Sequence, residues 1–256
     1  MKQHLLSKGL LLDNLGNLNE AGYAFSLVKT YDRKAIKANK FRIKEWDYYY
    51  LGDEHYGIAL TISDNSYMSL VSVSVLDFEK KIENTKSYIK WFTKGKTNFP
   101  SSSEDGNIEV KNKKYHMNFI NEHGERRLVC YMKNVSKGKD FSCDISLSSS
   151  NPNSMVIATP FNKKHHFYYN QKINNLVGKG TFIFGDLTYS FTKAYGVLDW
   201  GRGVWTYSNT WYWASLNSEY LGRPFGFNLG YGFGDTSQAS ENMLFVDKLA
   251  YKLNDV

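Results

Sequence analysis

The sequence predicts an all-β protein built from antiparallel strands. Three observations carry this prediction: apolar and polar residues alternate between short turn clusters, β-branched and aromatic residues fill these runs, and no convincing amphipathic helix interrupts them. Of the 256 residues, 42% are apolar and 16% aromatic, which is enough to build a sizeable core and excludes general disorder. Because helices are missing between the strands, a parallel βαβ arrangement is disfavoured.

Eight strands are expected in the first part of the chain. The clearest is the run Val-Ser-Val-Ser-Val at 71–75, which places valines on one face and serines on the other. Turn clusters at 51–54 and 63–66 separate neighbouring runs. So many strands with short links predict an antiparallel meander that closes into a barrel. The expected strands are 23–31, 41–51, 56–63, 67–78, 82–92, 115–121, 127–133 and 141–148.

A Ser-Lys-Gly-Lys turn at 136–139 predicts a β-hairpin between the last two of these strands. If the hairpin is centred between Ser136 and Lys137, Cys130 and Cys143 lie directly opposite each other. They are the only cysteines, so neither a disulfide framework nor a cysteine-rich metal site is expected. The favoured interpretation is a pair of reduced, half-buried thiols on neighbouring strands.

A loop with turn chemistry at 148–153 divides the chain into two predicted units, residues 1–150 and 151–256. Residues 1–172 hold 26 of the 32 basic and 18 of the 25 acidic side chains, whereas 11 of the 20 glycines lie between Gly178 and Gly234. Glycines inside strands mark bulges and sharp coiling, which a tightly curved barrel needs. The expected strands of the second unit are 166–172, 181–184, 187–191, 211–216, 225–230 and 243–251.

Several blocks of the sequence resemble a bacterial family known as domain-of-unknown-function family 2804. The blocks are Asp-Trp-Gly-Arg-Gly-Val-Trp at 199–205, Trp-Tyr-Trp-Ala at 211–214, Asn-Leu-Gly-Tyr-Gly-Phe-Gly-Asp at 228–235 and Glu-Asn at 241–242, with agreeing pieces at 22–24, 43–49 and 60–67. The resemblance covers nearly the whole chain and implies two lipocalin-like antiparallel barrels. This family is distantly similar to a calycin group that includes carotenoid hydratases and some fungal cyclases, but it brings no established activity of its own.

The chain departs from this family at its C-terminal end. Family members continue well beyond the Glu-Asn-Met-Leu-Phe segment with strands that close the second barrel, whereas this sequence ends at Val256. We therefore expect the second barrel to be incomplete, with open strand edges that favour self-association. A natural short form, a split gene and a truncated reading frame all fit this pattern.

Three residues are candidates for acid–base catalysis: Asp199, Arg202 and Glu241. Asp199 or Glu241 would donate a proton in an apolar surrounding, and the guanidinium of Arg202 would orient the carboxyl group or a ligand oxygen. The competing and favoured interpretation is a buried ion pair between Arg202 and one of these two acids, which would join the two barrels. Whether the protein is an enzyme stays open at this point.

Six further residues are candidates for ligand binding. Tryptophans are the large rings expected at the mouth or throat of a barrel that holds a ligand, although core filling must account for most of the aromatic residues. The candidates are Trp200, Trp205, Trp211, Trp213, Asn228 and Asn242.

No cofactor and no metal are expected. Gly230, Gly232 and Gly234 are spaced like a dinucleotide-binding loop, but Asp235 occupies the place of the third glycine and no helix follows. His165 and His166 are adjacent, so in a strand they would point to opposite faces and could not share a metal ion.

The sequence favours an apolar small molecule as the partner, bound in a barrel or between barrels. The alternatives are a cofactor-independent hydratase, isomerase or cyclase, a carbohydrate-binding or interaction module, and an inactive fragment of a longer protein. The scattered lysines lack a nucleic-acid-binding motif, so no nucleic acid is expected. Since no secretory signal and no apolar run of membrane-spanning length are found, we expect a cytoplasmic protein without stable membrane insertion.

Overall fold

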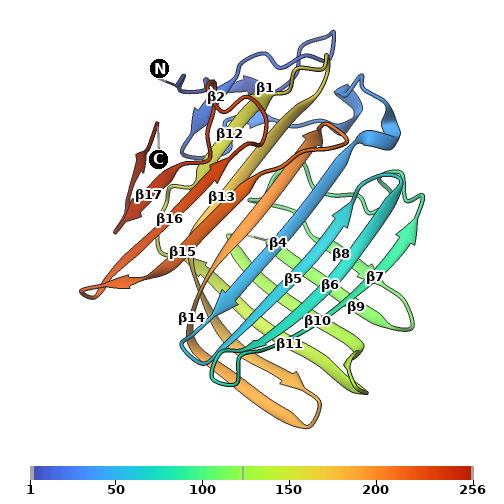
Figure 1. Cartoon of the computed structure of the whole chain (residues 1–256), viewed down its shortest axis with the longest axis vertical. Helices are drawn as coiled ribbons and strands as arrows, with labels where there is room; N and C mark the ends of the chain where they lie inside the picture. The colour runs from blue at the N-terminus through green and yellow to red at the C-terminus, as the bar shows by residue number, and fades with distance from the viewer. Residues whose placement is uncertain (1–2, 123, 255–256) are drawn as a thin grey trace.

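The computed structural model describes residues 3–122 and 124–254, and it confirms the all-β prediction (Figure 1). The described residues form eighteen strands and two short 3-10 turns, η1 (Arg33–Ala35) and η2 (Lys40–Arg42). Near the N-terminus, β1 (Gly9–Leu10) and β3 (Lys29–Thr30) form a small parallel pair. No helix in the described part of the chain has the length and apolar character needed to cross a bilayer.

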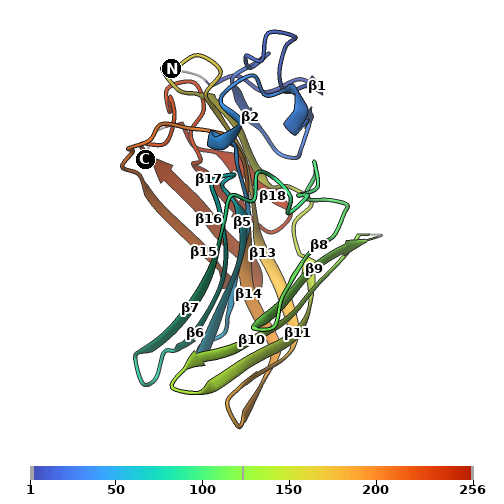
Figure 2. The same cartoon turned by 90° about the vertical axis from the view of Figure 1, so that its right-hand side faces the viewer.

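Ten strands form one long antiparallel path. The order in space is β7-β6-β5-β4-β14-β13-β11-β10-β9-β8. Figure 2 shows the two arms of this sheet, β5–β7 and β9–β11, facing each other like the walls of a half-open barrel. The arms meet where the Tyr88 hydroxyl of β7 donates to the Lys133 carbonyl of β10, at 3.1 Å. The strands are β4 (Lys44–Gly52), β5 (Tyr56–Asp64), β6 (Met68–Asp77), β7 (Ile82–Trp91), β8 (Ile108–Lys111), β9 (Tyr115–Glu122), β10 (Glu125–Ser136), β11 (Lys139–Ser149), β13 (Phe167–Phe184) and β14 (Leu187–Val204).

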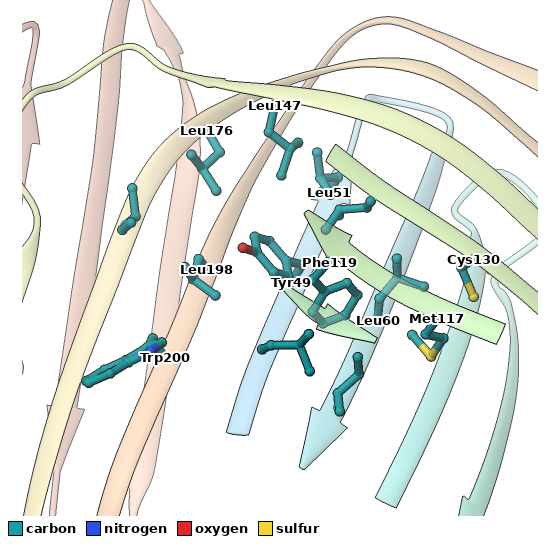
Figure 3. Close-up of a cluster of buried hydrophobic side chains, with 14 of the residues drawn as sticks. Tyr49, Leu51, Leu60, Met117, Phe119, Cys130, Leu147, Leu176, Leu198 and Trp200 are labelled. Carbon is teal, nitrogen blue, oxygen red and sulfur yellow. The ribbon is translucent and has the colours of Figure 1, made fainter. Parts of the chain in front are cut away.

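Side chains of alternating residues fill the space between the two arms. On β4 the odd-numbered positions from Glu45 to Leu51 are buried, while the even-numbered positions from Lys44 to Gly52 lie on the outer face. This alternation is what the pleat of a strand imposes on a half-buried sequence. Figure 3 shows the buried cluster; its labelled residues are Tyr49, Leu51, Leu60, Met117, Phe119, Cys130, Leu147, Leu176, Leu198 and Trp200.

The hairpin of β10 and β11 forms as the turn at 136–139 predicts. Cys130 and Cys143 are directly opposite in the register, as expected, and both carry free thiols. They are more buried than expected, with 2% and 6% of their surface exposed. Burial raises the pKa of the Cys130 thiol well above its usual value, so the pair is part of the apolar core.

The strand β13 continues where the sequence analysis predicted a break. Residues 166–172 and 181–184 were expected as two strands, but they belong to one strand of 18 residues. The pairing of β13 with β14 shifts its register twice within this strand, between Ile173 and Leu176 and between Gly178 and Gly180. Such bulges let a strand bend without ending.

Three strands were not predicted: β1, β8 and β12 (Met155–Pro160). β12 pairs with β2 (Gly22–Ala24) on one side and with residues 167–172 of β13 on the other. It is buried on both faces from Met155 to Thr159, so its side chains do not alternate between apolar and polar. A short continuous apolar run of this kind gives no periodic signal.

The last four strands form a separate open sheet in the order β15-β16-β17-β18. They are β15 (Tyr212–Tyr220), β16 (Arg223–Tyr231), β17 (Met243–Val246) and β18 (Leu249–Lys252). This sheet packs against β13 and β14 and does not close, which confirms the expected incomplete second barrel. The predicted strand 243–251 is a hairpin, because the chain turns at Asp247 with φ of 55°.

The predicted boundary between residues 150 and 151 falls between β11 and β12. Both of these strands pair with β13, so the large sheet draws on the chain on both sides of the boundary. The division into two units at this position stays a prediction.

Candidate functional site

A cleft of about 390 Å³ lies between the outer face of the large sheet and the facing side of the four-stranded sheet. The large sheet supplies the floor of the cleft. The floor residues are Trp46 and Tyr48 of β4, Thr61 and Ser63 of β5, Asn65 in the turn after β5, Tyr168 and Lys172 of β13, and Asp199 of β14. The remaining wall consists of Trp205, Trp211, Trp213, Phe233 and Glu241.

The strand register aligns the polar groups of the floor in one row. Lys172 is opposite Asp199, Asp199 is opposite Tyr48, and Tyr48 is opposite Thr61, across four neighbouring strands. Directly opposed residues of antiparallel strands bring their Cβ atoms to about 5 Å. Four residues that are far apart in the sequence therefore meet on one face.

Gly201 makes room for the Trp46 ring beside this row. The two residues are opposite each other in the pairing of β14 with β4. A Cβ atom at position 201 would lie only 2.2 Å from the Trp46 ring. The indole can lie against the backbone of β14 only because position 201 has no side chain.

Lys172 lies between the two acidic groups of the cleft. Its Nζ is 2.7 Å from the Asp199 carboxylate and 3.7 Å from that of Glu241, and only 2% of its side chain is exposed. The same ammonium group lies 4.8 Å from the centre of the Trp213 ring, within range of a cation–π interaction. Lys172 therefore bridges the two acids inside the cleft.

Neutral amides hold the two carboxyl groups in place. Asn170 Nδ2 donates to Asp199 Oδ1 at 2.7 Å. Asn228 Nδ2 donates to the Glu241 backbone carbonyl at 2.8 Å and to its Oε2 at 3.4 Å. The Trp213 indole N–H donates to Asn228 Oδ1 at 2.7 Å, so Trp213 is fixed by the same network.

Burial raises the pKa of three groups in this cleft: Glu241, Tyr168 and Tyr48. Burial, and to a lesser degree the charge of Asp199, raises the pKa of Glu241 above its usual value, although Lys172 acts in the opposite direction. Burial raises the pKa of Tyr168 well above its usual range, and the neighbouring Glu241 adds to this rise. Burial, followed by the neighbours Tyr50 and Asp199, raises the pKa of Tyr48 to about 12.

Aromatic rings of the floor and of the wall pack together along one side of the cleft. Trp46 stacks on Tyr168 with ring centres 5.7 Å apart, and it meets Trp205 edge to face at 4.9 Å. Phe233 packs edge to face against Tyr168 at 4.6 Å and against Trp211 at 5.3 Å. Trp211 remains 56% exposed, so it is the most accessible of these tryptophans. The wall offers dispersion contacts to an apolar group, and the charged row offers hydrogen bonds.

Five of the sequence-predicted residues line the cleft: Asp199, Glu241, Trp205, Trp211 and Trp213. Asn228 lies behind them and contacts both Trp213 and Glu241. Asn242 accepts a hydrogen bond from the Gly230 backbone N–H at 2.8 Å, so it fixes the segment that carries Glu241.

Arg202 and Trp200 lie on the opposite face of β14, inside the large sheet. Arg202 is fully buried and pairs with Asp47 at 2.9 Å, with the Trp46 carbonyl at 2.8 Å as a further acceptor. Its guanidinium lies 4.2 Å from the centre of the Trp200 ring. A buried ion pair of Arg202 was expected, but the expected partners, Asp199 and Glu241, were wrong. Side chains three positions apart on a strand point to opposite faces, so Asp199 and Arg202 cannot meet across β14.

Sequence reasoning missed four important residues of the floor: Lys172, Tyr48, Trp46 and Tyr168. A signal for two of them was present, because Tyr168 and Lys172 stand an even number of positions apart in a predicted strand and so share a face. The sequence contains no signal that aligns this strand with Asp199 or Tyr48, since pairing across distant strands depends on the whole sheet.

Comparison with known proteins adds a family and a fold. A family model described as "Domain of unknown function (DUF2804)" matches residues 2–256. Among solved structures, the chain is similar to a protein named as an AttH from Nitrosomonas europaea, with 12% identity and a TM-score of 0.52 over 85% of this chain and 69% of that chain. It is also similar to kievitone hydratase from Nectria haematococca, with 11% identity and a TM-score of 0.46 over 87% of this chain and 70% of that chain. No curated protein matches the sequence. At 12% identity, the first likeness supports the fold alone.

Proposed function

Because this chain belongs to the DUF2804 family, whose description names no activity, we propose its function from the cleft: it binds a small molecule with an apolar body and one polar group. The proposal rests on one observation. A wall of aromatic rings and a buried Lys172–Asp199–Glu241 cluster face the same space of about 390 Å³.

The size and lining of the cleft fit this class of ligand. Small-molecule sites in proteins usually enclose about 300 to 1,000 Å³ and combine an apolar lining with a few polar groups. Here the apolar body would contact Trp46, Trp205 and Trp211. A hydroxyl or carbonyl group would reach Asp199 or Glu241, whose protonated form can donate a hydrogen bond.

The ring geometry favours a compact ligand over a flat sugar chain. Trp46 and Trp205 meet at 88°, and Trp211 and Phe233 at 63°. Sugar stacking would use exposed rings that are roughly coplanar, so a carbohydrate-binding module is the weaker alternative. The cytoplasmic setting and the exclusion of nucleic-acid partners remain predictions from the sequence.

Binding can be tested with 2-naphthol as a probe, since it joins an apolar ring system to one hydroxyl group, and with naphthalene as its counterpart without the hydroxyl. We expect 2-naphthol to quench tryptophan fluorescence saturably and to give a 1:1 adduct in native mass spectrometry. Naphthalene should bind more weakly, by roughly tenfold, because one hydrogen bond to a charged group is lost.

Two tryptophan variants locate the probe. Trp211→Ala should weaken 2-naphthol binding by roughly tenfold, since a stacked ring contributes about 1 kcal/mol beyond its buried area. Trp91→Ala is the matched control, because Trp91 on β7 is 61% exposed and lies outside the cleft. Equal loss of affinity in the two variants would contradict the assignment of binding to this cleft.

A second candidate function is acid–base catalysis on the bound molecule, as a cofactor-independent hydratase, isomerase or cyclase. The raised pKa of Glu241 beside an apolar wall favours it, since a carboxyl group whose pKa is raised by burial can act as a general acid. Asp199 would accept a proton, with Lys172 stabilising its charge.

Proton transfer can be detected without knowing the substrate. Any small molecule that co-purifies with the protein is incubated with it in D₂O, and deuterium bound to carbon is measured by mass spectrometry. Glu241→Gln and Asp199→Asn should each abolish the exchange while the ligand still binds. If the ligand acquires no deuterium with the unmodified protein, the function is binding alone.

A further inference from the structure

Both faces of the four-stranded sheet carry apolar residues. On its inner face Met243 and Phe245 are buried, and Ser215 and Asn217 accept hydrogen bonds from Asn174 of β13 at 2.9 Å each.

The outer face carries the residues of the other parity, among them Tyr212, Leu216 and Tyr220. An antiparallel sheet that packs one face on the core normally turns a polar face to water. An apolar outer face is therefore unusual.

The apolar residues of the outer face form a continuous surface across the sheet. One row crosses all four strands from β15 to β18, and each of its residues is directly opposite the next. The row is Leu216, Phe227, Leu244 and Tyr251. A second row is formed by Tyr212 and Tyr231 at the end of β15 and β16. Side chains paired in this way touch along each row.

This outer face is uncovered. The exposed fractions are 71% for Tyr212, 70% for Tyr231, 67% for Tyr220, 58% for Leu249 and 48% for Tyr251. Among the described residues, none of the outer face belongs to either buried cluster of the molecule. The sheet makes its main contacts with β13 and β14 through its inner face, and Figure 1 shows β15–β17 at the left flank of the molecule.

We propose that this outer face is a dimer interface, on which the same face of a second copy of this chain stacks sheet against sheet. A tyrosine that becomes fully covered buries about 150 to 250 Å². The four exposed tyrosines would therefore contribute roughly 500 Å² per copy, and the leucines and half-buried phenylalanines bring the patch near the roughly 800 Å² per partner of a stable interface.

The chemistry of the patch suits a second copy of itself. Its centre carries no charged side chain, so two copies related by a twofold axis would not oppose like charges there. Arg223 and Asp247 lie at one end of the sheet, 3.7 Å apart, and supply the polar rim that such interfaces have. Exposed tyrosine is also among the residue types enriched at protein interfaces.

The test is the molar mass of the full 256-residue chain by light scattering and native mass spectrometry between low and high micromolar concentration. We expect a dimer. The double variant Leu216→Lys with Tyr251→Lys places charges at both ends of the central row, and it should weaken dimerisation at least tenfold while the circular dichroism spectrum is unchanged. Tyr212→Lys, at a 71% exposed position, is a second variant in case the double variant does not fold.

Tyr207→Lys is the matched control. Tyr207 is 93% exposed but lies in the loop before β15, so its replacement should leave the dimer intact. A wild-type protein that stays monomeric throughout the concentration range would overturn the proposal. So would a dimer that survives both the double variant and Tyr212→Lys. A monomer with lipid or detergent bound would also refute it, because another occupant then covers the face.

Hydrogen exchange distinguishes stacked faces from paired edges. β15 and β18 are the outermost strands of this sheet, so a dimer formed through edges would protect their outward amides at high concentration. In a stacked dimer these amides continue to exchange, while tyrosine fluorescence changes. Protection of an edge strand on dimerisation would therefore refute the stacked arrangement in favour of the edge pairing expected from the sequence.

Discussion

The chemistry of the cleft depends on single side chains, above all on the carboxyl group of Glu241. Its carboxyl group is buried beside Asp199, and Lys172 only partly offsets the resulting rise in its pKa. The folded state therefore holds a proton on Glu241 more tightly than the unfolded chain does. This residue should contribute a pH dependence to stability that is opposite to that of an ordinary paired carboxylate.

We predict that Glu241→Gln, which resembles the protonated form, gains stability relative to wild type as the pH rises. The contribution of Glu241 is fully present below pH 4.5 and is lost as the pH rises through its raised folded-state pKa. Each unit by which that pKa is raised amounts to about 1.4 kcal/mol. Urea unfolding of both proteins from pH 4 to 8 measures the difference, with Glu125→Gln on the exposed surface of β10 as control. A difference that does not change with pH would contradict the prediction.

Arg202 offers a test of the interior of the large sheet. Arg202→Met leaves Asp47 buried without its cation, and breaking a buried pair typically costs about 3 to 5 kcal/mol. The double variant with Asp47→Leu should recover much of this loss, as measured by urea unfolding. Arg127→Met is the control, because the Arg127–Asp144 pair is about half exposed and such pairs contribute about 0 to 1 kcal/mol. Comparable losses in the two single variants would argue against a buried ion pair.

Some residues of the site could be predicted from the sequence and others could not. Asp199, Glu241 and three tryptophans could be selected because acidic residues and large rings in one aromatic-rich block suggest a site. Asp199 and Arg202 could have been assigned to opposite faces from parity alone. Parity places Lys172 on the same face as Tyr168, but it does not show that Asp199 is its partner across β13 and β14, because no local pattern determines which strands pair.

Among the strands, the floor of the cleft depends on one glycine of β14, Gly201. Position 201 accepts the Trp46 ring only without a side chain. Strand interiors rarely favour glycine, because it packs nothing and loses more entropy on folding. Its presence here follows from the close approach of the indole to the backbone.

We predict that Gly201→Ala lowers stability by about 1 to 3 kcal/mol, as overpacking usually does, and weakens 2-naphthol binding because Trp46 must move. Thermal unfolding and fluorescence titration measure the two effects. Adding Trp46→Leu should restore part of the stability by making room for the methyl group, but not the affinity. Full affinity in Gly201→Ala would mean that Trp46 does not contact the ligand.

Strand boundaries were predictable wherever the pattern alternated. β5, β6 and β7 begin and end within one or two residues of the expected positions, since each combines alternation with clear turns. The interior of β13 was not predictable. Asn174 and Asn175 suggest a turn, yet the Asn174 side chain bonds to Ser215 and Asn217 of the neighbouring sheet, which compensates the local preference for a break.

In the molecule as a whole, the cleft lies where the two sheets meet. Most of the large sheet belongs to one buried cluster, while Met243 and Phe245 of the four-stranded sheet share a second cluster with Met155, Ile157 and Tyr168 of the large sheet. A ligand in the cleft would contact residues attached to both. The sequence predicted an all-β molecule with an open second sheet, but not that β13 and β14 would serve both sheets, because that follows only from the complete order of strands.

We predict that a bound ligand stabilises both sheets together. At a concentration one hundred times its Kd, a ligand adds about 2.7 kcal/mol, which for a chain of this length raises Tm by about 5 to 10 °C. Scanning calorimetry with 2-naphthol measures the shift, and hydrogen exchange should slow in β4 and β14 as well as in β15 and β16. Trp211→Ala should reduce the shift and Trp91→Ala should not. Slower exchange in one sheet alone would place the ligand elsewhere.

The two faces of β14 also restrict how a gene for this fold can change in length. Asp199 and Gly201 face the cleft, whereas Trp200 and Arg202 face the interior, so neighbouring codons specify different environments. Inserting one codon before position 199 would exchange the two sets, placing a carboxylate in the apolar core and a guanidinium in the cleft. Inserting two codons would restore the parity. Length variation within this strand should therefore be tolerated in even steps, and a single inserted codon should be as harmful as the loss of the site and the core together.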